Sequence, residues 1–147
     1  MLCYDVSTIM FKYMNFKTKH QFKKTNKNYN KNEINDLYTI KRIYLYRIND
    51  KILINYTNVV AIDASNNDKI KNLNNFKKLK ELDVQGDDCG IDDNGIKNLN
   101  LKKLNAYNNQ KITDVNHMTN LEDLNTGLYS GIDDNGIKKI NLKNYDG

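Results

Sequence analysis

The repeat that decides the fold is Cys89-Gly-Ile-Asp-Asp-Asn-Gly-Ile-Lys-Asn-Leu99, and it returns as Ser130-Gly-Ile-Asp-Asp-Asn-Gly-Ile-Lys-Lys-Ile140. Eight consecutive residues, Gly90–Lys97 and Gly131–Lys138, are identical at a separation of 41 residues. Between the two copies lies a looser variant, Lys111-Ile-Thr-Asp-Val-Asn-His-Met-Thr-Asn-Leu121. Chance explains such an identity poorly. The chain is therefore built from repeats, and the separation spans two of them.

A second pattern, apolar-x-x-apolar-x-apolar, precedes each of these segments. It occurs at Ile40-Ile43-Leu45, Val59-Ile62-Ala64, Leu79-Leu82-Val84, Leu101-Leu104-Ala106 and Leu121-Leu124-Thr126, and a sixth copy begins at Leu142-Tyr145-Gly147. The middle residues are 19, 20, 22, 20 and 21 residues apart. Alternation of this kind predicts short strands whose apolar side chains point inward. Regular spacing stacks such strands into a parallel sheet, and the apolar residues of each return half, such as Ile70-Leu73-Phe76 at helix-like spacing, close the core.

Short polar residues follow the strands where the chain must turn. Asn67, Asp87 and Asn109 each lie eight residues after the first apolar residue of a triplet. We expect their side chains to bond backbone groups of the bend. Tyr129 takes this place in the next unit, which predicts a different turn there.

The two Asp-Asp-Asn-Gly segments, Asp92–Gly95 and Asp133–Gly136, are predicted to start helices with capping acids. They lack the alternating ligands and distal glutamate of an EF-hand calcium loop. Cys3 and Cys89 match no metal or redox spacing, so we expect no metal and no cofactor.

Residues 40–147 resemble the leucine-rich-repeat family, and the Ile-Asp-Asp-Asn-Gly-Ile-Lys segments are similar to the "ITDxGL" signature of its cysteine-containing subtype. The resemblance implies an α/β solenoid over residues 37–147, with parallel strands on the concave face and about five units, the last one incomplete. That subtype commonly follows an F-box.

Residues 1–36 are expected to form a small helical module. Ile9, Met10, Tyr13 and Met14 share one face of a helix. The order of residues is similar to the F-box motif, although Cys3 stands where that motif usually has proline. The adaptor-binding residues that this resemblance implies are Leu2, Asp5, Val6, Ile9, Met10, Tyr13, Met14, Phe16, Phe22 and Tyr29, with Thr25 and Tyr29 replacing the usual valine and tryptophan.

An F-box protein of this kind is a substrate receptor. The resemblance implies that the module binds the Skp-type adaptor of a cullin–RING (SCF-type) ubiquitin ligase, that the repeats bind a target protein, and that the chain carries no catalytic residue. Strand residues between the inward ones face the concave surface. The target-binding residues predicted there are Arg42, Tyr44, Tyr46, Asp63, Glu81, Asp83, Gln85, Lys103, Asn105, Tyr107 and Asp123.

The basic charge of the chain belongs to its N-terminal part. Residues 1–32 contain seven lysines and Asp5 as their sole acid, a net charge of +6, whereas the whole chain is +5. Such a segment could steer association with an acidic adaptor. An alternative is a nucleic-acid-binding arm, in which these lysines would contact phosphates and the aromatic residues would stack on bases. The expected position of Phe16, Phe22 and Tyr29 on the apolar helix face argues against this alternative. A further alternative is a repeat scaffold without any ligase role.

The remaining expectations concern location and assembly. No apolar run is long enough to span a bilayer, so we expect no membrane partner. We expect a cytoplasmic protein, with the nucleus as a second location and a host's cytoplasm if the chain is viral. The chain stops at Gly147 just as another strand begins, which predicts self-association through an uncapped C-terminal end.

Overall fold

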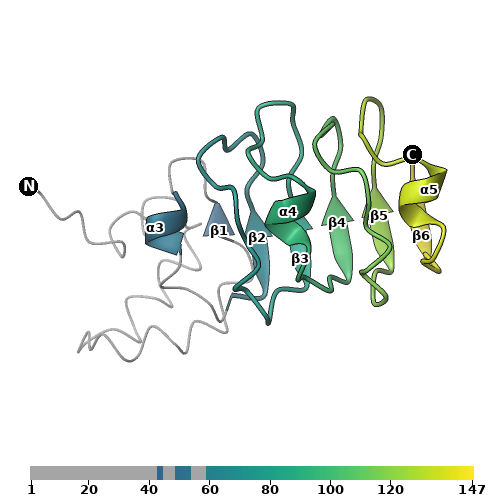
Figure 1. Cartoon of the computed structure of the whole chain (residues 1–147), viewed down its shortest axis with the longest axis horizontal. Coiled ribbons are helices and arrows are strands. Elements are labelled where there is room, and N and C mark those ends of the chain that lie inside the picture. The colour runs from purple at the N-terminus through teal and green to yellow at the C-terminus, as the bar shows by residue number, and fades with distance from the viewer. Residues whose placement is uncertain (1–42, 45–48, 54–58) are drawn as a thin grey trace, which may run out of the picture.

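The computed structural model of the chain describes residues 43–44, 49–53 and 59–147. Six short strands form one sheet in which every neighbouring pair is parallel. They are β1 (Ile43–Tyr44), β2 (Ala61–Asp63), β3 (Glu81–Asp83), β4 (Lys103–Asn105), β5 (Asp123–Asn125) and β6 (Asn144–Asp146). Strand order follows chain order, so each pass of the chain adds one strand beside the last (Figure 1). The predicted solenoid of parallel strands is confirmed.

The register of the sheet follows the spacing of the apolar triplets. The middle residues of the triplets lie opposite one another from β2 to β6, namely Ile62, Leu82, Leu104, Leu124 and Tyr145. The first four are buried, as predicted for inward-pointing side chains. Tyr145 is 48% exposed because it belongs to the edge strand of the sheet.

The core lies between the sheet and the returning segments. Beneath the strands it contains Ala64, Val84 and Ala106, and the return halves supply Ile70, Leu73, Phe76, Ile91, Ile96, Leu99, Ile112, Val115 and Met118. Burial of one large aliphatic side chain contributes about 1.5–3 kcal/mol. No unit encloses its own apolar face, so stability comes from the stacking of neighbours.

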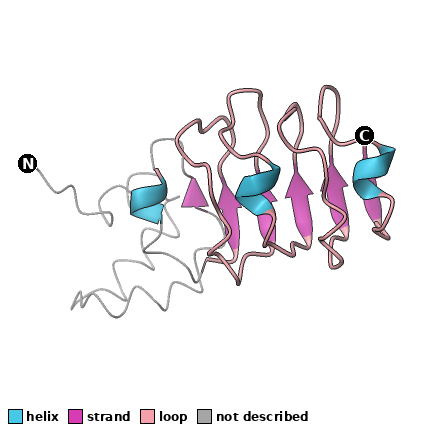
Figure 2. Cartoon of the chain, in the orientation of Figure 1, coloured by secondary structure: helices cyan, strands magenta, loops and turns pink. Residues whose placement is uncertain are grey.

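The helix-like spacing of the return halves produces helices in alternate units only. They are the single-turn helices α3 (Asp50–Leu53), α4 (Asp93–Ile96) and α5 (Asp134–Ile137). The segments after β2 and β4, residues 64–80 and 106–122, return through loops and turns instead, as Figure 2 shows. The structural period is therefore two units, which matches the 41-residue separation of the identical segments. None of the helices in the described part of the chain is long and apolar enough to cross a membrane.

Capping acids start the second and third of these helices, as predicted. The Asp92 carboxylate accepts a hydrogen bond from the amide of Gly95 at 2.9 Å. Asp133 accepts one from the amide of Gly136 at 3.0 Å. The bond lowers the pKa of Asp133 from its ordinary value.

The polar side chains in the turns after the strands bond backbone groups there, as predicted. Asn67 and Asn109 are buried, and each side chain accepts a bond from the backbone amide two residues further on, at 2.8 and 3.0 Å. The Asp87 carboxylate also bonds a backbone group of the bend, the amide of Asp88 at 3.0 Å, but Asp87 is exposed. In that unit Cys89 is buried close to the bend instead.

Candidate functional site

The candidate site is the face of the sheet that points away from the core. Its side chains form two rows that run across the strands in register. The first row contains Glu81, Lys103, Asp123 and Asn144, and the second contains Asp83, Asn105, Asn125 and Asp146, with Asp63 opposite Asp83 at the β2 end. Because side chains alternate along a strand, every second residue of β2–β6 reaches this face. We call it the open face.

A depression of about 490 Å³ lies on the open face and is lined by β3, β4, β5 and β6. We call it the hollow. It is a shallow surface open to solvent rather than an enclosed cavity, and its walls are strand residues held in place by the ladder of parallel pairs. Such a surface suits an extended chain or a protein surface better than a small molecule, which needs a concave, mostly apolar site.

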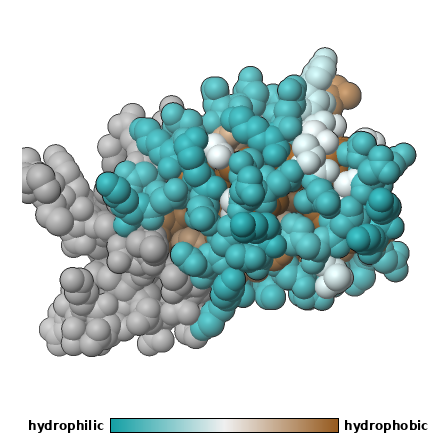
Figure 3. Space-filling model, in the orientation of Figure 1, coloured by the Kyte–Doolittle hydropathy of each residue, from teal (hydrophilic) through white to brown (hydrophobic). Residues whose placement is uncertain are grey.

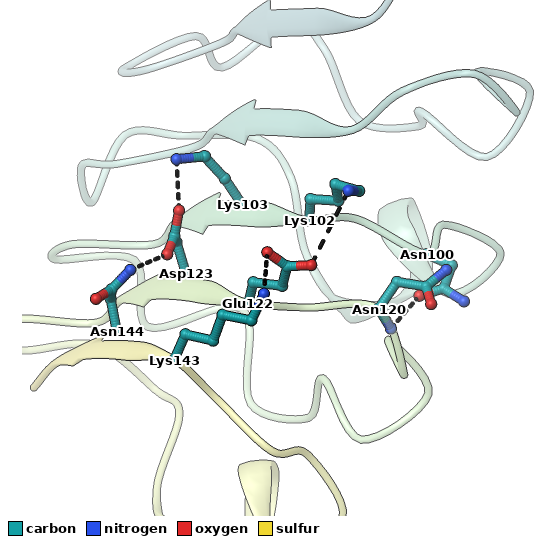
Figure 4. Close-up of polar contacts among 8 residues, drawn as sticks. All are labelled: Asn100, Lys102, Lys103, Asn120, Glu122, Asp123, Lys143 and Asn144. Atoms are coloured by element: carbon teal, nitrogen blue, oxygen red, sulfur yellow. Dashed lines mark hydrogen bonds and ion pairs between the residues drawn. The ribbon is translucent and has the colours of Figure 1, made fainter.

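An ion pair crosses the hollow between adjacent strands. The Lys103 ammonium lies 2.5 Å from the Asp123 carboxylate, and the Asn144 amide also donates to that carboxylate (Figure 4). The bond with Lys103 lowers the pKa of Asp123, and the same bond raises the pKa of Lys103. Both groups are therefore charged at neutral pH.

Polar contacts fix other side chains along the strands. The Asn105 amide donates to the Asp83 carboxylate at 3.1 Å. Where the strands begin, Glu122 lies between Lys143 at 3.1 Å and Lys102 at 3.9 Å (Figure 4). Exposed ion pairs of this kind contribute little to stability, about 0–1 kcal/mol each. They mainly orient the side chains along the sheet.

The hollow carries net negative charge. Four carboxylates line it, from Glu81, Asp83, Asp123 and Asp146, and the ammonium of Lys103 is the one basic group in its lining, so its net charge is −3. A cleft lined by one sign of charge concentrates counter-charged partners and raises their rate of association. The hollow is therefore suited to a basic ligand.

One acceptor at the hollow has no partner among the described residues. The Oδ1 atom of Asn125 is buried and accepts no hydrogen bond there. A buried acceptor without a donor costs about 1–3 kcal/mol.

The structure brings most of the predicted target-binding residues together. Those on or next to the open face are Asp63, Glu81, Asp83, Gln85, Lys103, Asn105, Tyr107 and Asp123, and five of them line the hollow itself. Tyr44 lies in β1, whereas Arg42 and Tyr46 lie outside the described residues. The expected adaptor-binding residues, from Leu2 to Tyr29, also lie outside the described residues.

Sequence reasoning missed the contribution of β6. Asn144, Tyr145 and Asp146 line the hollow, and none of these three was among the predicted target contacts. The signal for β6 was the weak triplet Leu142-Tyr145-Gly147, in which a tyrosine and a glycine replace aliphatic residues.

The described residues contain no group of three or more His, Cys, Asp or Glu side chains placed to hold a metal ion. No family model matches the chain, and neither does any curated protein or any solved structure.

Proposed function

We propose that this chain is a substrate receptor of a cullin–RING ubiquitin ligase, in which a solenoid of the leucine-rich-repeat kind holds the target protein and the N-terminal F-box-like segment binds a Skp-type adaptor. One observation supports the target-binding part above all others. A parallel sheet presents a face that no described element covers, with a hollow of net charge −3 formed by four neighbouring strands.

The geometry of that face favours recognition of a protein segment. Side chains stand at regular intervals along each strand and between strands, about 3.3 Å and 4.8 Å apart. An extended partner presents side chains at the same interval. A partner needs only complementary charge and shape to bind such a surface. A receptor subunit has to bind its target and needs no catalytic group.

The adaptor-binding part of the proposal is supported by sequence. Leu2, Asp5, Ile9 and Tyr13 occupy motif positions of the F-box in the right order, and the segment precedes the repeats as it does in F-box receptors. Its net charge of +6 over residues 1–32 complements an acidic adaptor.

A pull-down with purified Skp-type adaptor tests this part. We expect the full chain to retain the adaptor and an Ile9→Asp/Met14→Asp double variant to lose it, because charges would replace apolar contacts. The matched control is Lys138→Asp, a change on an exposed residue of the solenoid. Circular dichroism spectra of all three chains must agree.

Two results would count against the proposal. No retention of the adaptor by the folded, unmodified chain would remove the ligase role and leave a repeat-based scaffold. Retention by the double variant at the level of the unmodified chain would show that the F-box-like residues are not the contact.

A further inference from the structure

Large apolar side chains project from the loop that follows β5. Leu128 is 68% exposed and Tyr129 is 73% exposed. Figure 3 shows pale and brown side chains standing out at the upper edge of an otherwise hydrophilic surface, where Figure 1 places this loop. Monomeric proteins carry scattered exposed apolar residues, whereas these two are adjacent in one loop.

The backbone of this loop differs from its counterparts. After β2, β3 and β4 the residue with positive φ is Asn66, Gly86 or Asn108, types that tolerate the left-handed region. After β5 the positive-φ residues are Gly127 and Tyr129, with φ angles of 50° and 65°. A bulky aromatic residue rarely adopts this conformation, and here its exposed ring gains no burial in return.

The ring of Tyr107 extends this apolar surface toward the hollow. A Cβ atom at Gly127 would lie 2.1 Å from Cδ2 of Tyr107, so the ring covers the backbone of Gly127. Tyr107 remains 43% exposed. We name Tyr107, Leu128 and Tyr129 the aromatic rim.

The aromatic rim and the hollow are continuous. Tyr107 follows Asn105 on the strand line of β4, and its amide donates to the Asn105 side chain at 3.2 Å. Gly127 likewise stands two residues after Asn125 of β5, and its amide donates to the carbonyl oxygen of Asp146 at 3.1 Å. Two residues of strand span roughly 7 Å, so one bound segment can contact both surfaces.

We infer that the aromatic rim and the hollow together bind one extended segment of a target protein, with lysine or arginine side chains along the hollow and one large apolar or aromatic side chain on the rim. The inference rests on the target-binding half of the proposed function and is independent of the adaptor. The net charge of −3 selects the basic part of the segment. Tyrosine is among the residue types that contribute most of the binding energy at interfaces. We therefore expect the two tyrosines of the aromatic rim to hold the apolar side chain of the target segment.

The hollow also favours a target segment over a second copy of the solenoid as the occupant. If the open faces of two solenoids met, each would present its own acidic hollow to the other. Like charges placed together in this way are destabilising. A basic target segment instead complements the net charge of −3 of the residues that line the hollow.

Selection of binders from a random peptide display library by the full chain tests the inference. We expect enriched peptides to carry basic residues together with one aromatic or large aliphatic residue at a fixed spacing. A Leu128→Ser/Tyr129→Asn variant should bind these peptides at least about tenfold more weakly. Asparagine suits the backbone at position 129, so this variant should keep the unfolding midpoint of the unmodified chain.

A second variant separates the two surfaces. Glu81→Gln/Asp83→Asn should lose the preference for basic residues and keep the preference for the apolar anchor. Lys138→Ser, which changes an exposed residue away from both surfaces, should behave as the unmodified chain. Adaptor retention by all three variants reports separately on the ligase role.

Three outcomes would overturn the inference. One is the absence of any enriched peptide with the folded chain, and a second is enrichment of acidic peptides. The third is unchanged affinity of the selected peptides for the Leu128→Ser/Tyr129→Asn variant. Failure of the adaptor pull-down alone would leave the inference standing.

Discussion

The buried side chain of Asn109 connects two neighbouring units of the solenoid. It is 1% exposed, and its amide donates to the carbonyl oxygens of Val84 and Ile91 at 2.9 and 3.3 Å. Its Oδ1 atom accepts from the amide of Lys111. The side chain therefore ties the bend of its own unit to the backbone of the preceding unit.

We predict that Asn109→Ala lowers the free energy of unfolding by about 2–4 kcal/mol, because buried backbone groups lose their partners. Asp87→Ala is the matched control, since Asp87 stands at the same interval after its strand but is exposed. It should change stability by no more than about 0.5 kcal/mol. Urea unfolding of the two variants measures the difference, and equal losses would refute the role given to Asn109.

Asp87 is exposed where Asn67 and Asn109 are buried, and this difference has a physical cause in the length of its unit. That unit has 22 residues between strand centres where its neighbour has 20, and one of the two added residues falls within the turn and the other within the return half. Cys89 fills the buried place, with its sulfur 3.6 Å from the Ala64 carbonyl oxygen. Lys111 then binds the carbonyl oxygens of Asp87 and Cys89, at 3.1 and 2.6 Å. A fixed interval from the strand could not locate this arrangement, which depends on a lysine in the next unit.

Burial raises the pKa of the Cys89 thiol, which predicts a loss of stability at alkaline pH. In the unfolded chain the thiol ionises near pH 8.5, at about its ordinary pKa. The folded chain keeps the proton to higher pH, so the unfolded state binds fewer protons and stability falls as pH rises from there. A Cys89→Ala variant lacks this contribution.

The measurement is urea unfolding of both chains under reducing conditions over a series of pH values. The difference in unfolding free energy between the unmodified chain and Cys89→Ala should be constant below about pH 8 and should shrink above about pH 9. A difference that stays constant through the alkaline range would show that the thiol ionises equally in both states.

Among the elements, return segments with a helix alternate with return segments made of turns. The difference lies in which side chain accepts hydrogen bonds from the first backbone amides of each return segment. In the third and fifth units, Asp92 and Asp133 cap a helix. In the fourth unit, the amides of Thr113 and Asp114 instead bond the carboxylate of Asp93 in the preceding helix, at 2.8 and 3.3 Å. The apolar spacing alone, Ile112-Val115-Met118, could not reveal this difference.

Gly95 offers a test of the contact between neighbouring returns. A Cβ atom there would lie 2.4 Å from the carbonyl oxygen of Lys71. Although alanine usually stabilises a helix by about 1 kcal/mol over glycine, we expect Gly95→Ala to lower stability by about 1–3 kcal/mol through this clash. Asn94→Ala, an exposed neighbour in the same helix, should change stability by less than about 0.5 kcal/mol.

Thermal or urea unfolding followed by circular dichroism compares the two variants. A gain in stability for Gly95→Ala would mean that the returns of the second and third units do not approach as closely as the structure has them. Gly136→Ala, whose added atom would lie 2.2 Å from the Thr113 carbonyl oxygen, should repeat the result one period later.

At the scale of the whole molecule, the spacing of the apolar triplets was enough to predict the parallel sheet and its register. When units of equal length stack, only one register lets each unit cover the inward-pointing side chains of its neighbour. The aromatic rim could not be predicted in this way, because Leu128 and Tyr129 stand outside both the strand and the return patterns. The charge of the hollow required the register of β3–β6, which brings together acids that are far apart in sequence.

The outer edge of β6 leads to the last prediction, self-association of the chain. β6 is an edge strand of the sheet, all three of its residues are exposed, and Tyr145 lies at the end of a row whose other members are buried. Ile137, Ile140 and Leu142 beside it are partly buried. Edge strands with apolar neighbours pair with other chains, so we expect the sedimentation coefficient of the chain to rise with concentration.

A charge on this edge should suppress the association. We expect Tyr145→Lys to shift the chain toward the monomer, because inward-pointing charge is a device by which proteins protect sheet edges. Tyr129→Asn is the matched control, since it removes an exposed tyrosine from the aromatic rim and leaves β6 intact. Association lost in Tyr129→Asn but kept in Tyr145→Lys would place the contact between copies on the rim, and the rim would then be a dimer surface rather than a target-binding one.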